Sequence, residues 1–323
     1  MSRKQIAFFN LPVPQCWDTS QGQKLKSACN FFPTTLRVLR ISWGFIESDF
    51  FTFAVPNTVF GLVSALASSR VLEGPPPLLI DVLRRGPSVL FFNFYSLLLF
   101  DLANQQSPES VEEDRVNKPW RPIPSGQITS EQTRKAILYT ALAALGFNHV
   151  LGIWSEGLLV QVLSYYYNEL RGGSGLFRDV IIAISYGLAN QTSLQLAIGP
   201  ENTVSSEGRL WTAVISTIVL TTMHIQDLKD QKGDRKLGRK TMPLLLGDRS
   251  CRVALACLIP LWSLFSVRFW KLGVICSSFY FLLAALIAVR VLVKREQQQD
   301  ARTWRLWCLW HASLYAIPLL SNR

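Results

Sequence analysis

Residues 87–126 read PSVLFFNFYSLLLFDLANQQSPESVEEDRVNKPWRPIPSG, and an apolar run turns there abruptly into a charged one. The apolar part, residues 87–100, shows no alternation of polar and apolar positions, which is typical of a helix in lipid rather than of a membrane β-strand. The charged part opens with five carboxylates: Asp101, Glu109, Glu112, Glu113 and Asp114. Cations and a proline-rich turn follow at once. Ionisable groups at the edge of an apolar helix are costly, so a function is the first explanation to test.

The composition of the whole chain agrees with a membrane protein. Its 323 residues are 49% hydrophobic and only 17% charged, whereas a soluble domain has about one quarter charged residues. A helix needs roughly 20 apolar residues to cross a bilayer. Nine segments approach that length: 47–69, 86–104, 134–154, 156–170, 178–198, 209–226, 250–268, 272–291 and 303–320. We therefore predict an all-α, polytopic membrane protein, with an N-terminal segment, residues 1–45, and a nine-helix transmembrane catalytic domain, residues 46–323.

The positions of Lys and Arg predict the orientation of these segments. The net charge is +11, and most cations fall in the N-terminal segment and in the loops after the even-numbered segments. Because cytoplasmic loops carry an excess of Lys and Arg, the N-terminus and these loops should face the cytoplasm. We interpret the positive charge as this topology signal and expect membrane lipid, but no nucleic acid, as a partner. The compartment that we expect is the endoplasmic reticulum membrane.

A second charged stretch resembles the first in its placement. Residues 221–243 read TTMHIQDLKDQKGDRKLGRKTMP and follow the sixth apolar segment. Asp227, Asp230 and Asp234 are spaced by three and four residues, which would place them on one face of a helix. Cations and a proline follow, as they do in the first stretch. We call residues 101–121 the first acidic stretch and residues 227–240 the second acidic stretch.

Paired acidic stretches predict a site for a metal-bound diphosphate. Mg²⁺ prefers carboxylate oxygens and is commonly held by a few carboxylates and substrate phosphates. Arg and Lys pair with the remaining phosphate oxygens, and an apolar cavity between helices would hold a hydrocarbon tail. An ordinary solvated helix cap explains either stretch alone equally well, but two in matching places favour a site. A transporter is a further alternative, although transporters place their charges near the membrane midplane rather than at one face.

The two stretches also resemble motifs of the UbiA superfamily of intramembrane prenyltransferases. The matching residues are Asn104–Gln105, Asp114 to Pro122 with Ser125–Gly126, and Asp227 to Pro243; FAVPNTVFG, residues 53–61, lies where the family has a further segment. The resemblance covers residues 50–320. It implies a nine-helix bundle, two Mg²⁺ ions, and a prenyl diphosphate bound head-first near the cytoplasmic face.

The departures from the family pattern narrow the resemblance. The first motif lacks the expected earlier Asp and is about two residues longer, so that Glu109 or Glu113 would supply the second acid. Val55 and Asn57 replace the Arg and His that are often found in the first helix. This altered form is similar to the fungal UbiA-type terpene cyclases, in which the substrate's own double bonds attack the allylic cation. A prenyltransferase that acts on an aromatic or other acceptor stays open as the alternative.

The resemblance and the chemistry together assign roles to particular residues. The expected Mg²⁺ ligands are Asn104, Glu109, Glu113, Asp114, Asp227, Asp230 and Asp234, and all except the two glutamates are also designated catalytic. The expected diphosphate contacts are Asn117, Lys118, Arg121, Lys232, Arg235 and Lys240. The expected contacts of the prenyl chain and its cation are Asn57, Phe92, Tyr95, Tyr165, Tyr166 and Asn168. The Trp-rich residues 304–315 predict an interfacial anchor. The motifs specify neither the length of the prenyl chain, farnesyl or geranylgeranyl, nor the oligomeric state.

Overall fold

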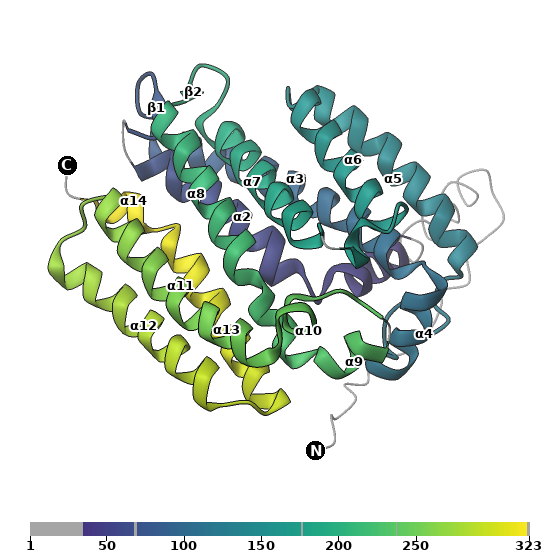
Figure 1. The fold of residues 1–323 in the computed structure, drawn as a ribbon. Helices are drawn as coiled ribbons and strands as arrows, with labels where there is room; N and C mark the ends of the chain where they lie inside the picture. Colours follow the sequence, from purple (N-terminus) through teal and green to yellow (C-terminus); the bar gives the residue numbers. More distant parts are fainter. Residues whose placement is uncertain (1–34, 68–69, 176, 237, 322–323) are drawn as a thin grey trace, which may run out of the picture. The chain divides into compact units, whose positions relative to one another are not determined.

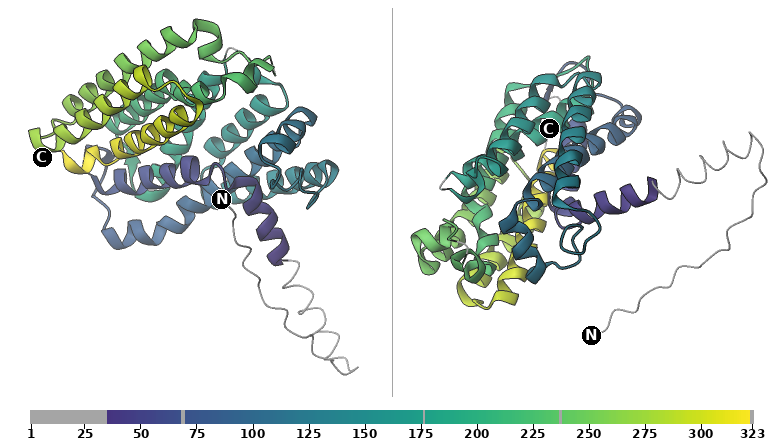
Figure 2. Two further views of the ribbon diagram at one scale, coloured as in Figure 1. Left: turned by 90° about the horizontal axis from the view of Figure 1, so that it is seen from below. Right: turned by 90° about the vertical axis from the view of Figure 1, so that its right-hand side faces the viewer.

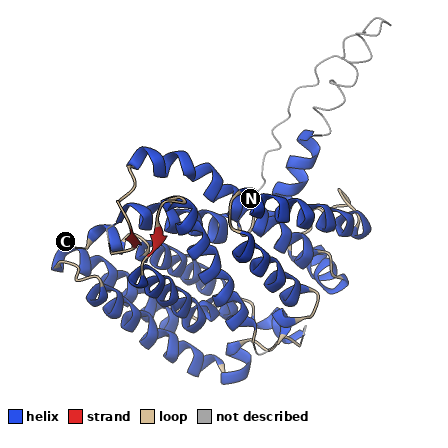
Figure 3. Ribbon diagram, turned by 90° about the horizontal axis from the view of Figure 1, so that it is seen from above, coloured by secondary structure: helices blue, strands red, loops and turns tan. Residues whose placement is uncertain are grey.

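The computed structural model describes residues 35–67, 70–175, 177–236 and 238–321, and the chain divides into two units, Met1–Gly44 and Phe45–Arg323. Residues 35–44 of the first unit are helical. Residues 1–34 of the predicted N-terminal segment lie outside the described residues. The described part of the second unit is built from helices and one antiparallel pair of two-residue strands, β1 (Leu72–Glu73) and β2 (Thr203–Val204) (Figures 1 and 3). The predicted all-α class is therefore confirmed.

The helices of the second unit follow one another with short connections. In chain order they are η1 (Phe50–Ala54), α2 (Val55–Ala67), α3 (Leu79–Gln105), α4 (Pro108–Asn117), α5 (Ser130–Val150), α6 (Trp154–Asn168), η2 (Gly172–Ser174), α7 (Arg178–Ile198), α8 (Ser206–Thr222), η3 (Met223–Lys229), α9 (Gln231–Lys236), α10 (Met242–Leu246), α11 (Asp248–Phe269), α12 (Val274–Val293), α13 (Gln297–Leu314) and α14 (Ile317–Leu320).

Each of the nine predicted apolar segments overlaps one of these helices. Four helical spans of the described residues are long and apolar enough to cross a membrane: Phe50–Ala67, Leu79–Gln105, Asp248–Phe269 and Val274–Val293. These spans support an integral membrane protein.

The sixth predicted segment differs from the helix that forms there. The α-helical pattern of α8 ends at Thr222, the chain tightens into the 3₁₀ turn η3, and α9 starts only at Gln231. Asp227 lies in η3, Asp230 follows its last residue and Asp234 lies in α9, so the three aspartates do not share one continuous α-helix. Asp227 and Asp234 are buried, whereas Asp230, at the end of η3, is exposed. The predicted common face is therefore wrong for Asp230.

Local sequence signals account for several helix starts. Ser107 caps α4 by accepting a hydrogen bond from the Ser110 amide, and proline occupies the first position of that helix. Thr129 and Gln132 form a capping box at the start of α5. Such caps satisfy amides that have no partner within the helix, and each is worth about 1 kcal/mol.

Close contact between helices builds the interior. α2 packs on α7, α7 on α8, and α11 on α12, as the views in Figure 2 show from two further directions. Gly61 of α2 permits the close approach to α7, because an added Cβ would lie 2.5 Å from the Ser193 carbonyl oxygen. Trp307 and Trp310 of α13 are buried in the core, and Trp310 donates a hydrogen bond to the Ser263 hydroxyl. At these two positions the predicted interfacial anchor is wrong.

Candidate active site

The two acidic stretches meet at Arg239. Its Nη2 donates a hydrogen bond of 2.8 Å to Glu113 Oε2, and its Nη1 donates one of 3.3 Å to Asp234 Oδ1. Glu113 belongs to α4 and Asp234 to α9, and both helices lie at the end of the unit away from β1 and β2 (Figure 1). The two acidic stretches thus converge in space.

Asp227 is held by an arginine from another helix. Arg178, the first residue of α7, donates hydrogen bonds of 2.9 Å to each carboxylate oxygen of Asp227. Asp179 lies next to this pair, 3.9 Å from the Arg178 guanidinium. Arg178 was not among the predicted site residues. Arg178 is the first residue of the predicted apolar segment 178–198, on the predicted cytoplasmic side, and this position could have indicated a role in the site.

A third arginine pairs within the first acidic stretch. Arg121 donates hydrogen bonds of 2.8 and 3.1 Å to the two oxygens of Asp114, and both side chains are buried. Burial and the neighbouring Arg121 charge lower the pKa of the Lys118 ammonium. The Lys118 and Arg121 charges repel each other, and an anion such as a diphosphate bound beside them would be attracted by both.

Asp234 is the residue at this end whose chemistry best suits a cation. Its Oδ2 atom is buried and has no hydrogen-bond partner among the described residues. Burial and the nearby Asp227 carboxylate raise the pKa of the Asp234 carboxyl above its ordinary value. Both effects would be relieved by a bound cation, and carboxylate oxygens are the donors that Mg²⁺ prefers. The residues at this end therefore fit Mg²⁺ in their chemistry.

The carboxylates are not gathered into a metal-binding cluster. In the described ranges of the chain, no group of three or more His, Cys, Asp and Glu side chains could hold a metal ion. Guanidinium groups instead occupy the oxygens of Asp114, Asp227 and Asp234. The two acidic stretches come together, but their carboxylates do not form a shared metal site. A metal would have to displace at least part of these ion pairs.

The geometry favours Glu113 over Glu109 as the additional acid. Glu109 is 62% exposed and pairs with Arg171, while Glu113 is 27% exposed and shares Arg239 with Asp234. Asp230 points outward and pairs with the adjacent Lys229. The remaining predicted contacts on exposed positions of these stretches are Asn117, Lys232, Arg235 and Lys240.

Neighbouring segments hold the two acidic stretches in place. In the first stretch, Gln105 donates a hydrogen bond of 2.7 Å to the Phe45 carbonyl oxygen. Near its end, Trp120 donates one of 2.7 Å to Glu47. In the second stretch, Gln231 donates one of 2.8 Å to Asp248, at the start of α11.

Asp248 in turn belongs to a buried network between three helices. Arg252 of α11 pairs with Asp248, 2.9 Å away, and with Asp300 of α13, 2.7 Å away. A further bond of 3.0 Å joins Arg252 to the Val291 carbonyl oxygen of α12. The second acidic stretch is thereby connected to the packing of α11, α12 and α13.

Asn104 and Asn168, predicted for different roles, contact each other. Asn104 Nδ2 donates a hydrogen bond of 3.0 Å to Asn168 Oδ1, and Asn168 Nδ2 donates one to the Ser164 carbonyl oxygen. Asn104 belongs to the first acidic stretch, so this pair joins that stretch, at the end of α3, to the end of α6.

The predicted contacts of the prenyl chain divide into buried and exposed groups. Phe92 and Tyr95 are buried together, and Asn57 is fully buried, without a side-chain hydrogen-bond partner in the part of the chain that the structure describes. In contrast, the rings of Tyr165 and Tyr166 are 59% and 43% exposed. The geometry therefore supports an interior position for the first three residues and a surface position for the two tyrosines.

An aromatic cluster joins η1, α7 and α13. Tyr186 stands edge-on to Phe53, with ring centroids 5.0 Å apart, and donates a hydrogen bond to the Thr52 carbonyl oxygen. His311 lies parallel to Trp307 at 4.9 Å and edge-on to Tyr315 at 5.1 Å. Aromatic faces stabilise cations without reacting with them, so this cluster extends the set of candidate contacts.

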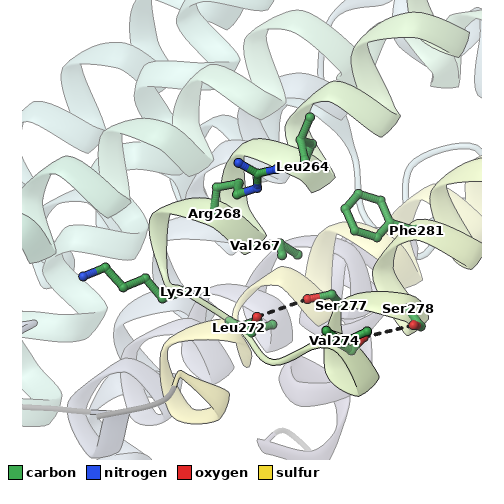
Figure 4. A pocket seen from close by; sticks show the side chains of 9 residues that line it. All are labelled: Leu264, Val267, Arg268, Lys271, Leu272, Val274, Ser277, Ser278 and Phe281. Carbon is green, nitrogen blue, oxygen red and sulfur yellow. Dashed lines mark hydrogen bonds between the residues drawn. The ribbon is translucent and has the colours of Figure 1, made fainter.

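The structure also contains a hollow of about 400 Å³ between α11 and α12 (Figure 4). Its lining comes from the end of α11, the connecting turn and the start of α12, and includes Val267, Arg268 and Phe281. No predicted site residue lines it. The hollow is therefore separate from the predicted hydrocarbon cavity, which stays a prediction.

Comparison with known proteins relates the chain to one family. Residues 101–312 match the model of the UbiA prenyltransferase family. The chain is 32% identical to somaliensene A/B synthase of Streptomyces somaliensis, over 90% of this chain and 95% of that protein. Two proteins of Hericium erinaceus, diterpene cyclase eriG and polyprenyl transferase eriF, are 28% and 29% identical over 85% of this chain, and 86% and 92% of their own lengths are covered.

A solved structure shows a similar fold. The structure concerns digeranylgeranylglyceryl phosphate synthase in membranes, and it aligns with a TM-score of 0.61 over 88% of this chain and 98% of that chain. The sequence identity is 18%, so the likeness bears on the fold alone.

Proposed function

The chain belongs to the UbiA prenyltransferase family, and from that premise we propose that it is a Mg²⁺-dependent membrane terpene cyclase. The substrate is a prenyl diphosphate, farnesyl or geranylgeranyl diphosphate. The enzyme breaks the allylic C–O bond, and the electron pair leaves with the diphosphate. A double bond of the same chain then attacks the cation, and loss of a proton gives a cyclic terpene.

One observation carries this proposal: Arg239 contacts Asp234 of its own stretch and Glu113 of the other stretch, which is 126 positions away in the sequence. Acids and cations from two remote segments are thereby combined at one end of a helical unit. A diphosphate with Mg²⁺ requires this combination of charges.

The relatives favour a cyclase and also supply the alternative. Two of the three named relatives are a synthase and a cyclase, which supports intramolecular attack. The third is named a polyprenyl transferase. The alternative is accordingly a UbiA-type prenyltransferase that moves the prenyl group to an aromatic or other acceptor.

The chain's own residues would bind and orient the diphosphate. Asn104, Glu113, Asp114, Asp227, Asp230 and Asp234 would hold Mg²⁺, which supplies Lewis-acid stabilisation of the leaving group. The remaining phosphate oxygens would be contacted by Asn117, Lys118, Arg121, Lys232, Arg235 and Lys240. Buried aromatic side chains such as Phe92 and Tyr95 exclude water and face the developing cation, at about 0.5–2 kcal/mol for each cation–π contact.

The proposal includes an orientation in the membrane. All nine apolar segments cross the bilayer, and the acidic end faces the cytoplasm from the endoplasmic reticulum membrane. The support is the excess of Lys and Arg in the loops at this end and the presence of four helical spans that satisfy the length and polarity of a crossing. Reporter fusions at residues 238 and 273, which are expected on opposite sides, test the assignment.

An assay without acceptor distinguishes the two functions. Purified protein in lipid is incubated with Mg²⁺ and either farnesyl or geranylgeranyl diphosphate, and extracted products are analysed by gas chromatography and mass spectrometry. A cyclic hydrocarbon formed from the diphosphate alone is the expected result. A product that forms only after a phenolic or other acceptor is added would replace the cyclase by the prenyltransferase.

A further inference from the structure

Arg239 lies where the two acidic stretches meet, and its two terminal nitrogens donate hydrogen bonds to two different carboxylates. Glu113, 2.8 Å away, comes from α4, and Asp234, 3.3 Å away, comes from α9. The Arg239 side chain is 39% exposed, whereas Asp234 is almost completely buried. The guanidinium group thus covers the inner carboxylate from the solvent side.

This contact satisfies Asp234 only in part. Arg239 binds Oδ1, while Oδ2 is buried and has no partner among the described residues. A guanidinium has a fixed planar fork and cannot turn toward both oxygens while it also reaches Glu113. A small divalent ion has no such constraint and binds carboxylate oxygens at about 2.0–2.1 Å. The unpartnered oxygen marks the position where a smaller cation would fit better than Arg239.

We propose that Arg239 is an exchangeable cation of this site: it joins Glu113 and Asp234 in the substrate-free protein and moves to the diphosphate when Mg²⁺ takes these carboxylates. This inference rests on the proposed function. The displaced guanidinium gains a new partner, because the fork that matches a carboxylate also matches a phosphate. A cation stays beside Glu113 and Asp234 in both states and reduces the repulsion between the two carboxylates.

The exchange makes metal and diphosphate binding interdependent. Mg²⁺ alone must displace Arg239 from Glu113 and Asp234, and the displaced cation stays close to the ion and repels it. A diphosphate binds the displaced guanidinium and so removes the competitor. Each ligand therefore increases the affinity for the other, as thermodynamic linkage requires. Without Arg239, the metal alone should bind more tightly and this coupling should weaken.

Mn²⁺ binding in the absence of any diphosphate tests the exchange without turnover. The full-length protein in lipid nanodiscs is titrated with Mn²⁺ and free ion is followed by electron paramagnetic resonance. Arg239→Gln should bind Mn²⁺ roughly three- to tenfold more tightly than the original protein, as expected for removal of a half-exposed unit charge beside a divalent ion. An unchanged or weaker affinity in the folded variant overturns the proposal.

Arg115→Gln is the matched control. Arg115 lies in the first acidic stretch and pairs with Glu112 at 2.8 Å, and both side chains are exposed. The same change of net charge is made there without touching Glu113 or Asp234. Mn²⁺ affinity should stay as in the original protein, and an equal gain in both variants would overturn the proposal in favour of a bulk charge effect.

Arg239→Lys covers a loss of folding in the glutamine variant. The lysine keeps the charge but lacks the fork that contacts both carboxylates, so Mn²⁺ affinity should rise above that of the original protein. An affinity equal to the original overturns the exchange. A Mn²⁺ gain in a protein that makes no product from any prenyl diphosphate would leave the exchange standing and refute the proposed function instead.

Discussion

Arg178, the first residue of α7, holds both carboxylate oxygens of Asp227 at 2.9 Å, so that a helix distant in sequence fixes the first acid of the second stretch. The pair is largely buried. A carboxylate at such a place is well positioned by its partner and remains next to Asp179 and Asp234, which share its electrostatic environment.

Asp227→Asn should reduce turnover by about 100-fold or more, because one charge is lost from the group that stabilises the leaving diphosphate. Product formation by purified protein measures the effect. Asp81→Asn is the control, since Asp81 is an acidic residue in the first turn of α3 and outside both acidic stretches. Full turnover in a folded Asp227→Asn protein would remove the second acidic stretch from the mechanism.

Glu113→Gln should weaken Mg²⁺ activation of turnover more than Glu109→Gln. Glu113 reaches Asp234 through Arg239, whereas Glu109 pairs with Arg171 in solvent. The measurement is the Mg²⁺ concentration that gives half-maximal turnover, with the exposed Glu112→Gln as a control. A larger shift for Glu109→Gln would reverse the choice between the two glutamates.

Stabilisation by Mg²⁺ should increase with pH. Burial and Asp227 raise the pKa of Asp234 above its ordinary value of 3.8. In the metal-free protein, the stability associated with this proton is therefore complete below 3.8 and is lost as the pH rises through the folded-state pKa. Above that pKa the free carboxylate binds Mg²⁺ without competition from the proton, so the ion should raise Tm more.

Thermal unfolding with and without Mg²⁺, across a pH series, measures this effect. Asp234→Asn cannot titrate at this position, and we expect a smaller pH dependence of the Mg²⁺ effect in that variant. An identical pH profile in both proteins would show that Asp234 does not take part in metal binding.

Arg252→Met should destabilise the protein by about 3–5 kcal/mol, because it leaves Asp300 buried without its partner. Both side chains are almost inaccessible, and their closest contact is 2.7 Å. Denaturant unfolding in detergent measures the loss. The double variant Arg252→Met, Asp300→Leu should recover much of it, and a double variant as unstable as the single one would argue against the ion pair as the cause.

The helices were predictable because apolar length is a local property of the chain. Each predicted segment corresponds to a helix, and even the short segment 156–170 is matched by α6 (Trp154–Asn168). α3 begins at Leu79, earlier than predicted, and in this added part Arg85 donates hydrogen bonds to the carbonyl oxygens of Ala197 and Ile198, a contact with α7 that hydropathy cannot show.

The site was predictable in its residue types and less so in its geometry. The succession of acids and cations identified both acidic stretches in the sequence. The choice of Glu113 over Glu109 depends on the contact of Glu113 with Arg239, which is 126 positions away. Asp230 lies at the break between η3 and α9 and is exposed, which the spacing of the aspartates did not reveal. The burial of Trp310 depends on Ser263 of α11, so a Trp-rich segment alone was an insufficient signal of an interfacial position.

Release of diphosphate from a prenyl diphosphate, with Mg²⁺ present and every acceptor absent, tests the central claim most directly. Purified protein in lipid should release inorganic diphosphate in equal amount to a cyclic hydrocarbon, and chelation of Mg²⁺ should stop both. Release that persists after chelation, or no release until an acceptor is supplied, would contradict the account.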